Sequence, residues 1–308
     1  MVENRTKSIF KNFLESPDSH FVYQNPDNLE SADETNCEIY NARNDLLRLY
    51  DSKLEPELEA SLEFVLGRES YISDQIEDAL AHFQRSLALL QPTTSGILSD
   101  SEKSINPQYC VVPNTINAAT ILLQLGLCYR RMAEKRPAMN KSYIVEALFW
   151  FKQSLEIMES RESFDLVAKF ISLVCDMLYR LENWTELHKW VQNSRKLHET
   201  YGMTGAIAVD CGFLAAVAGA EFDWLLSCEL AQQALLMSEQ DLEQSRAKES
   251  WYLLLLGRAQ RHLGEWQEAI NNLEWAKVVC ELQYEPVLYL SILEELRELY
   301  FFERSQLH

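Results

Sequence analysis

Glycine and proline are scarce in this chain, which has nine glycines and eight prolines among its 308 residues. Folds built from β-strands need many tight turns, and tight turns are rich in both residue types. The scarcity therefore argues against an all-β fold. Hydrophobic residues make up 47% of the chain and charged residues 24%, a composition typical of soluble globular proteins.

Positive charge is also scarce. The 28 Lys and Arg residues face 47 Asp and Glu residues, and the formal net charge is −19. A surface this acidic repels the phosphates of nucleic acids and of anionic lipids. We therefore expect neither nucleic acid nor a membrane as a partner.

Long hydrophobic runs are missing from the chain. The N-terminal sequence MVENRTKSIFKNF lacks the apolar stretch of a secretory signal, and the most apolar window, residues 206–226, is interrupted by Asp210, Glu221 and Asp223. The seven cysteines include no C-x-x-C pair, and most lie among apolar neighbours. Buried free thiols in a cytoplasmic protein explain this pattern better than a disulfide or zinc framework does.

The sequence motifs of common enzymes are absent as well. The chain has no phosphate-binding loop, no glycine-rich dinucleotide fingerprint, no nucleophile elbow and no H-E-x-x-H metal site. We therefore predict a protein that is not an enzyme and that holds neither a cofactor nor a metal. Catalytic groups assembled from distant parts of a chain leave no local mark, so an enzyme stays open as a third hypothesis.

A spacing of small residues recurs along the chain. Gly257 and Ala269 lie twelve residues apart in a helical segment, although a glycine inside a helix costs about 1 kcal/mol relative to alanine. Five pairs of residues share this relation: Gly67/Ala79, Gly126/Ala147, Cys175/Leu187, Ala215/Ser227 and Gly257/Ala269. The second of these pairs has nine extra residues between its members. The residues four and seven positions after each second member are Phe83/Ser86, Phe151/Ser154, Val191/Ser194, Ala231/Ala234 and Leu273/Ala276.

This pattern predicts antiparallel helix pairs. A small residue in the first helix, helix A, lets the second, helix B, approach closely, and larger apolar residues one turn away fill the space around the crossing. We interpret Gly257 and Ala269 as two small residues that face each other at such a crossing. A single pair cannot bury its apolar face, so the pairs are expected to stack into a solenoid.

The turn GEWQEA at residues 264–269 matches the G-x-[WY]-x-x-A pattern of the tetratricopeptide repeat (TPR), and ENW at 182–184 matches it loosely. The units resemble TPRs over roughly residues 55–303, although they are longer than the usual ~34 residues. The resemblance implies an all-α fold of TPR-like antiparallel helix pairs stacked into a right-handed superhelical solenoid, with helix A on its concave face.

The repeat domain is expected at residues 55–308, as about five helix pairs and a C-terminal helix. It follows a polar N-terminal arm and leading helix at residues 1–54. Residues 92–114 join the first two repeats without periodicity, and a connection of this length is usually disordered or functional. We interpret it as disordered.

Arginines gather around the C-terminal half of helix A in four of the repeats. They are Arg68, Arg130, Arg131, Arg180, Arg258 and Arg261. In one interpretation they complement the negative ends of the helix dipoles, a contribution of about 0.3–1 kcal/mol each. In the other they form a basic stripe in the concave groove that binds an acidic peptide, a carboxylate or a nucleotide.

The C-terminal segment 286–303 is expected to be a helix with a broad apolar face that includes Tyr300, Phe301 and Phe302. The repeat register places a further helix B one position after His308. Exposed apolar surface marks an interface. We therefore predict that residues 289–302 contact either a downstream effector domain or a second copy of the chain.

A second resemblance concerns the run WYLLLLGRAQRHLGEWQEAINNLEWAK and the following YLSILEELRELYFF. It is similar to the sensor repeats of some bacterial STAND-type signalling NTPases. Two further hypotheses for function follow. The first is a scaffold that binds a protein or peptide partner in its concave groove. The alternative is the ligand-sensing, regulatory part of such an NTPase, whose ATPase module lies outside this chain.

Overall fold

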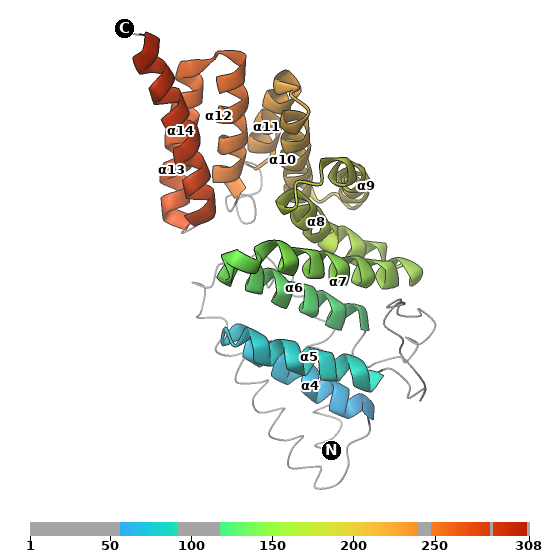
Figure 1. The fold of residues 1–308 in the computed structure, drawn as a ribbon. Coiled ribbons are helices and arrows are strands. Elements are labelled where there is room, and N and C mark those ends of the chain that lie inside the picture. Colours follow the sequence, from blue (N-terminus) through green and yellow to red (C-terminus); the bar gives the residue numbers. More distant parts are fainter. Residues whose placement is uncertain (1–55, 91–117, 239–247, 284–285, 307–308) are drawn as a thin grey trace. The chain divides into compact units, whose positions relative to one another are not determined.

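The structure of the protein is a computed structural model that describes residues 56–90, 118–238, 248–283 and 286–306 (Figure 1). This part of the chain contains eleven α-helices, one short 3-10 helix and no strand, which confirms the all-α prediction. The predicted N-terminal arm at residues 1–54 and most of the 92–114 connection lie outside the described residues.

The chain divides into two compact units, with the boundary between Phe164 and Asp165. The helices of the first unit are α4 (Pro56–Ile72), α5 (Ile76–Leu90), α6 (Ala118–Lys135), η2 (Pro137–Met139) and α7 (Asn140–Ser160). Those of the second are α8 (Phe164–Arg180), α9 (Trp184–Tyr201), α10 (Thr204–Ala220), α11 (Trp224–Ser238), α12 (Glu249–Leu263), α13 (Trp266–Gln283) and α14 (Pro286–Gln306). Consecutive helices form five A–B pairs, from α4/α5 to α12/α13, and α14 follows the last pair.

The positions that define the repeat are buried. Both members of every predicted pair are buried, and the residues four and seven positions after the second member are at most 1% exposed. The space beside the helix A glycine is filled by the large residue of helix B, which lies one turn after the small one. A Cβ at Gly67 would lie 2.7 Å from the Phe83 ring, and Gly126 faces Phe151 in the same way.

The A–B turns of four repeats share one backbone design. The residues with a left-handed backbone there are Asp74 (φ 61°), Glu182 (φ 56°), Phe222 (φ 65°) and Gly264 (φ 83°). In each turn the next amide donates to the carbonyl five residues earlier, with N–O distances of 2.9–3.0 Å. This is the Schellman end of a helix, which favours glycine at the left-handed position. Only the last turn has glycine there, so only that turn shows the full TPR pattern.

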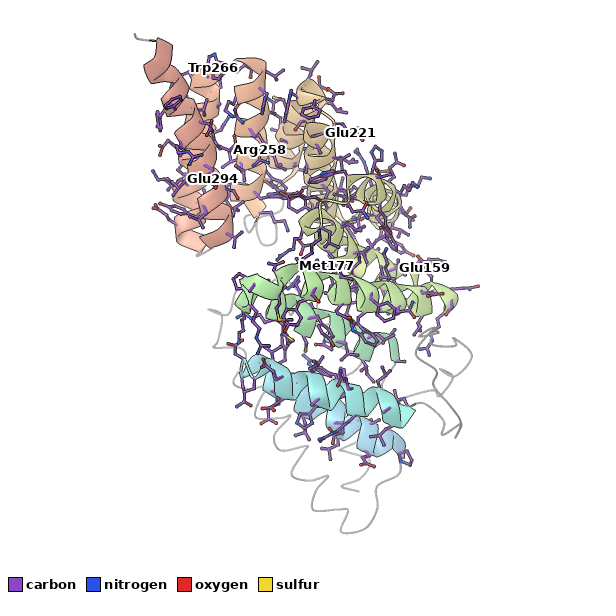
Figure 2. The ribbon with its side chains drawn as sticks, in the orientation of Figure 1. Glu159, Met177, Glu221, Arg258, Trp266 and Glu294 are labelled. Carbon is purple, nitrogen blue, oxygen red and sulfur yellow. The ribbon has the colours of Figure 1, made fainter. Side chains whose placement is uncertain are left out.

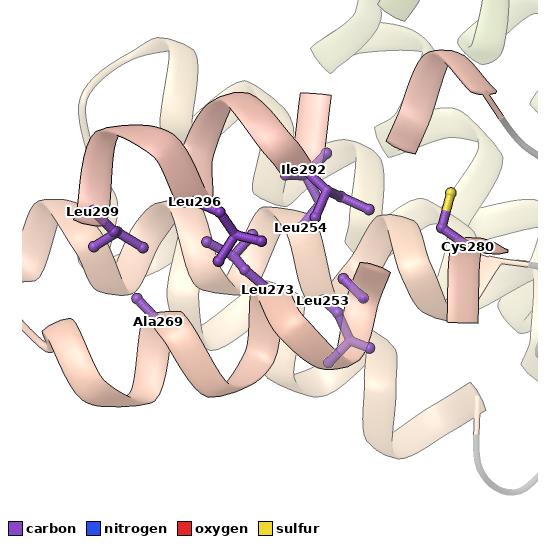
Figure 3. Close-up of a cluster of buried hydrophobic side chains, with 9 residues drawn as sticks. Leu253, Leu254, Ala269, Leu273, Cys280, Ile292, Leu296 and Leu299 are labelled. Atoms are coloured by element: carbon purple, nitrogen blue, oxygen red, sulfur yellow. The ribbon is translucent and has the colours of Figure 1, made fainter. Parts of the chain in front are cut away.

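The last three helices share one apolar core (Figure 3). Ile292, Leu296 and Leu299 of α14 are buried against Leu254 of α12 and Leu273 of α13. The burial of this face holds α14 on the last helix pair. Each Å² of apolar surface removed from water contributes about 25 cal/mol to stability.

The described cysteines are free and buried, as predicted: Cys128, Cys175, Cys211, Cys228 and Cys280. Burial raises the pKa of the Cys128 thiol to about 12. A thiol with this pKa is inert at neutral pH, because the thiolate is the reactive form. Within the described helices, none is long and apolar enough to cross a membrane.

Candidate functional site

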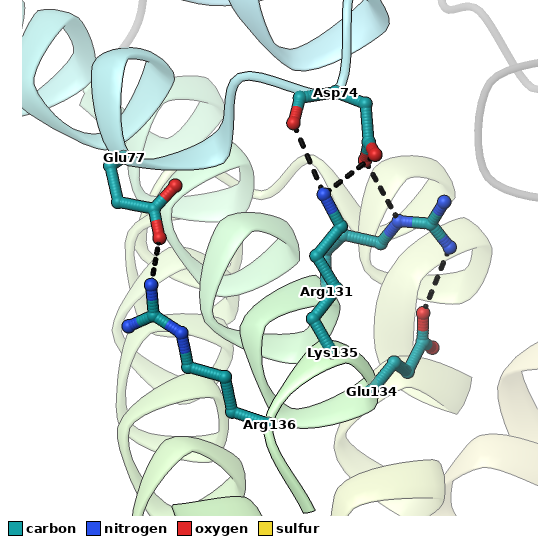
Figure 4. A network of polar contacts seen from close by, with 6 residues as sticks. All are labelled: Asp74, Glu77, Arg131, Glu134, Lys135 and Arg136. Atoms are coloured by element: carbon teal, nitrogen blue, oxygen red, sulfur yellow. Dashed lines mark hydrogen bonds and ion pairs between the residues drawn. The ribbon is translucent and has the colours of Figure 1, made fainter.

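Three of the predicted arginines belong to the first unit. Arg68 is only 8% exposed, and Arg130 is half-buried. The Arg131 guanidinium donates to Glu134 over 3.1 Å and lies 3.5 Å from the Asp74 carboxylate (Figure 4). Arg131 is therefore matched by carboxylates of the protein itself.

The same end of α6 carries further cations that reach the α4–α5 turn (Figure 4). The Lys135 ammonium lies 2.6 Å from the Asp74 carboxylate and donates to the Asp74 carbonyl over 3.1 Å. Arg136 pairs with Glu77 at the start of α5. The hydrogen bond and charge of Lys135 hold the pKa of Asp74 below its ordinary value. These contacts tie the turn of the first repeat to helix A of the second.

The other three arginines belong to the second unit. Arg180 lies 3.2 Å from Asp176, one turn earlier in α8. Arg258 and Arg261 of α12 both pair with Glu295 of α14, over 2.6 and 2.9 Å, and Figure 2 shows Arg258 beside the C-terminal helix. Glu295 is mostly buried, so these two pairs connect α12 to α14.

The six arginines differ in their positions along the helices and in their ion pairs. Only Arg180 and Arg261 lie in the last turn of their helix, where a dipole acts on a charge. Nearby carboxylates account for Arg131, Arg180, Arg258 and Arg261 without a ligand. A ligand on the predicted basic stripe has to compete with these acids.

A separate groove lies in the second unit, over α10 and between α9 and α11, with a volume of about 480 Å³. Its apolar lining consists of Leu214, Val217, Ala218, Leu226 and Leu230. Its polar wall comes from α9 and consists of His188, Gln192, Arg195, Lys196 and Glu199. Glu221, which directly follows α10, also lines the groove; its position is labelled in Figure 2. None of the six predicted arginines lines it.

The polar wall of the groove offers both donors and acceptors. Arg195 donates to Glu199 over 2.9 Å, and Gln192 lies 2.7 Å from the His188 ring. The hydrogen bond to Glu199 raises the pKa of Arg195, and Lys196 adds a second cation to this wall. An apolar floor beside such a wall can bury a hydrophobic side chain while it satisfies a peptide backbone.

The second unit also has a buried polar cluster. His198 and Asp210 are 1% and 0% exposed, and the His198 Nδ1 lies 2.6 Å from the Asp210 carboxylate. The other ring nitrogen lies 2.7 Å from the Ala168 carbonyl, and the Ser194 hydroxyl donates to Asp210 over 2.8 Å. Although Ser, His and Asp meet here, Ser194 donates to the carboxylate and all three side chains are enclosed. The cluster links α8, α9 and α10 and is structural.

The predicted C-terminal interface divides into two parts. Tyr300 donates from its hydroxyl to Glu274 of α13 over 3.0 Å, so its ring folds back onto the last pair. Phe301 is 76% exposed. Phe302 lies in α14, but its side chain is outside the described residues.

No family model matches this chain, and no curated protein matches its sequence. Its fold is similar to that of several solved structures. The match to BtubC (BKLC) from P. vanneervenii has a TM-score of 0.55 and 14% identity, over 81% of this chain and 91% of that one. The match to a Rap protein complexed with Competence and Sporulation Factor has a TM-score of 0.59 and 13% identity, over 90% and 68%.

A third similar structure is the Rap conjugation gene regulator of the plasmid pLS20 in complex with the Phr* peptide. Its TM-score is 0.50 at 10% identity, over 98% of this chain and 85% of that one. The chain has the fold of TPR-like helical repeat proteins. At these identities the likeness concerns the fold alone.

Sequence reasoning missed the groove because its residues come from three helices, namely α9, the C-terminal half of α10 and the first two turns of α11. It also missed the His198–Asp210 pair, for which a signal was present. Asp210 lies in the most apolar stretch of the chain, and a carboxylate at such a position requires a buried partner.

Proposed function

We propose that this chain is a non-enzymatic TPR-like scaffold that binds a protein or peptide partner, and that the groove over α10 is its binding surface. The observation that carries the proposal is the groove itself, with leucines and small residues on its floor and donors and acceptors on its α9 wall. Its volume of about 480 Å³ is within the range of pockets that hold small ligands. It is large enough for one or two side chains of a peptide.

The similar structures support the class of partner. The pLS20 Rap regulator was solved with the Phr* peptide, and another Rap protein with Competence and Sporulation Factor. Because the likeness is one of fold, it supports a protein or peptide partner for this chain and gives no position for it. The free, buried cysteines support a cytoplasmic location.

The concave groove with its arginines is the alternative surface for the same function. A partner that carries carboxylates would there displace Glu295 from Arg258 and Arg261, or Asp74 from Arg131. Displacing a mostly buried carboxylate leaves it unpaired and is unfavourable. For this reason we favour the groove over α10.

A random peptide library selected on the intact chain tests the proposal. Lys196→Glu and Leu226→Glu change the wall and the floor of the groove, and we expect each to weaken the selected peptides by about tenfold or more. Lys189→Glu on α9 and Leu236→Glu on α11 are matched controls, because both residues are exposed and lie outside the groove. Equal weakening by variants and controls would overturn the proposed site.

The same selected peptides test the arginine surface. If Arg130→Glu combined with Arg258→Glu abolishes binding while the groove variants bind normally, the concave surface is the correct one. The Arg258 change also removes a pair with Glu295, so the melting temperature of this variant has to be measured alongside. Loss of binding without loss of folding is the informative result.

One observation favours the sensor hypothesis as a second candidate. The outer face of α14 exposes Val287, Leu290 and Phe301 at 78%, 62% and 76%. This is surface that a further repeat, an attached effector domain or a second copy would cover. The length and the sequence of the protein as its own cells make it decide between these candidates. A protein longer than this chain that contains a phosphate-binding loop supports the STAND-type alternative, and a protein of this length without one contradicts it.

A further inference from the structure

A patch of exposed rings and leucines lies on the A–B turns of the last two repeats. We call it the turn patch, and it consists of Phe222, Trp224, Leu225, His262, Leu263 and Trp266. Phe222 is 78% exposed and Leu225 62%, while Leu263 and Trp266 are 39% and 40% exposed. Figure 2 shows Trp266 at the start of α13 and Glu221 beside the α10–α11 turn. None of the six residues lines the groove over α10.

Ring contacts make the turn patch continuous from one repeat to the next. The Phe222 and Trp224 rings meet edge to face with centroids 6.2 Å apart. The Trp224 ring is stacked flat on His262, at the end of the next helix A, with centroids 3.8 Å apart and an angle of 4° between the rings. Leu263 and Trp266 follow His262 in the chain around the next turn. The stack of Trp224 on His262 therefore joins the two turns.

Phe222 is not explained by the requirements of folding. It occupies the left-handed position of its turn, where the equivalent residues are Asp74, Glu182 and Gly264. A bulky side chain is rare with a positive φ, and an exposed phenylalanine gains nothing from burial. A residue that is unfavourable on both counts points to a role at the surface.

The rim of the turn patch is acidic. Glu221, Asp223, Glu265 and Glu268 are all exposed beside it. The neighbouring cation, Arg261, is held by Glu295. Partial burial and the charge of Arg261 lower the pKa of His262, which favours the neutral form of this ring. Negative rim and neutral rings together suit a cation, because carboxylates and aromatic faces both attract one.

We propose that the turn patch binds a basic amphipathic segment of a partner protein. Its apolar side chains lie on Phe222, Leu225 and Trp266, and its Lys or Arg side chains reach the rim carboxylates and the ring faces. Such a segment presents apolar residues at helical spacing, as other helix-binding surfaces require. This surface meets the groove over α10 at Glu221 and shares none of the other residues that line the groove. It does not depend on the function proposed for the groove.

The probe is a fluorescent amphipathic peptide of leucine and lysine, about five helical turns long. A peptide with the same leucines and glutamate in place of lysine tests charge, and a scrambled leucine–lysine peptide tests the helical spacing. We expect binding of the intact chain to the first peptide only. Equal binding of the scrambled peptide would mean that the net charge of −19 attracts any cation and would overturn the proposal.

Phe222→Gly separates binding from folding. Glycine suits the left-handed backbone, so this variant folds at least as well as the parent and has the same net charge. We expect it to weaken the leucine–lysine peptide by about tenfold. The matched control is Glu182→Gly, which makes the same backbone change in an equivalent turn and removes one negative charge.

The control is expected to bind within about twofold of the parent, since surface charges distant from an interface contribute little. Attraction by net charge alone predicts the opposite order, with Glu182→Gly weakened and Phe222→Gly unchanged. That order would contradict the proposal. Lys196→Glu in the groove over α10 is expected to leave this peptide bound, so failure of either surface is recognised separately.

Discussion

Leu273 of α13 occupies the space that a side chain at Gly257 of α12 would need. A Cβ at Gly257 would lie 2.6 Å from the Leu273 Cγ and 3.3 Å from the Ala269 carbonyl oxygen. Gly257 therefore meets the backbone of its predicted small partner and the side chain of the residue one turn later. The helix accepts a glycine, at about 1 kcal/mol relative to alanine, because Leu273 can then lie against its backbone.

Gly257→Leu is expected to destabilise the protein by a few kcal/mol through overpacking, which chemical unfolding measures. In Gly257→Ala the new methyl group overlaps with Leu273, and Leu273→Ala leaves a cavity. The double variant relieves the overlap, so its loss of stability is expected to be smaller than the sum of the single losses. Simple additivity would show that the two residues do not share this contact.

The His198–Asp210 pair gives a second prediction. Removing one member leaves a buried group unpaired, so His198→Ala and Asp210→Ala are each expected to destabilise the protein by about 3–5 kcal/mol. The double replacement is expected to cost much less than the sum. Ser154→Ala is the control, since it removes a single buried hydrogen bond to the Ala119 carbonyl and is expected to cost about 1 kcal/mol. Losses near 1 kcal/mol for all of the variants would contradict this role of the His198–Asp210 pair.

The Asp74 network predicts a small pH dependence. Lys135 lowers the pKa of Asp74 in the folded protein below its ordinary value of 3.8, so the stabilisation is present above that value. It is lost as the pH falls through the folded pKa. Asp74 is about half exposed, and an exposed pair contributes at most about 1 kcal/mol.

Asp74→Asn keeps a residue that tolerates the left-handed turn and removes the charge. We expect it to be slightly less stable than the parent at pH 7, with the difference disappearing below pH 3.8. Unfolding curves at several pH values measure this. A difference that grows as the pH falls would contradict the sign of the shift.

The outer face of α14 predicts association. Sedimentation of the 308-residue chain is expected to show a species larger than the monomer, because Leu290 and Phe301 are exposed on a helix whose opposite face is buried. Leu290→Ser with Phe301→Ser is expected to give a monomer. Tyr300→Phe is the control, since it keeps a ring and loses only the bond to Glu274. A parent protein that is monomeric at all concentrations would contradict self-association, and the face would then bind a different protein.

The fold could be predicted from the sequence because each helix crossing requires a small residue at a fixed position in the repeat. Gly67, Gly126 and Gly257 recur at a fixed distance from a buried large residue, and this regularity can be read without a structure. The partner of the glycine could not be read, because side-chain direction decides between two residues on one face of helix B.

The arginines show the opposite case. Arg131 meets Asp74, which lies 57 residues earlier, and Arg261 meets Glu295, which lies 34 residues later. Nothing in the local sequence pairs these charges, so a matched ion pair and a free basic stripe have the same sequence pattern. The groove over α10 was missed for a similar reason, because it is made by three helices and by no single motif.

Cross-linking of a bound peptide shows which surface of the protein holds it. A peptide selected on the intact chain is made with a photoreactive group and cross-linked, and the attached residues are mapped by mass spectrometry. The groove over α10 predicts cross-links to residues 188–199 of α9 and 226–230 of α11. Cross-links confined to the arginine positions of helix A, around Arg130 and Arg258, would contradict it.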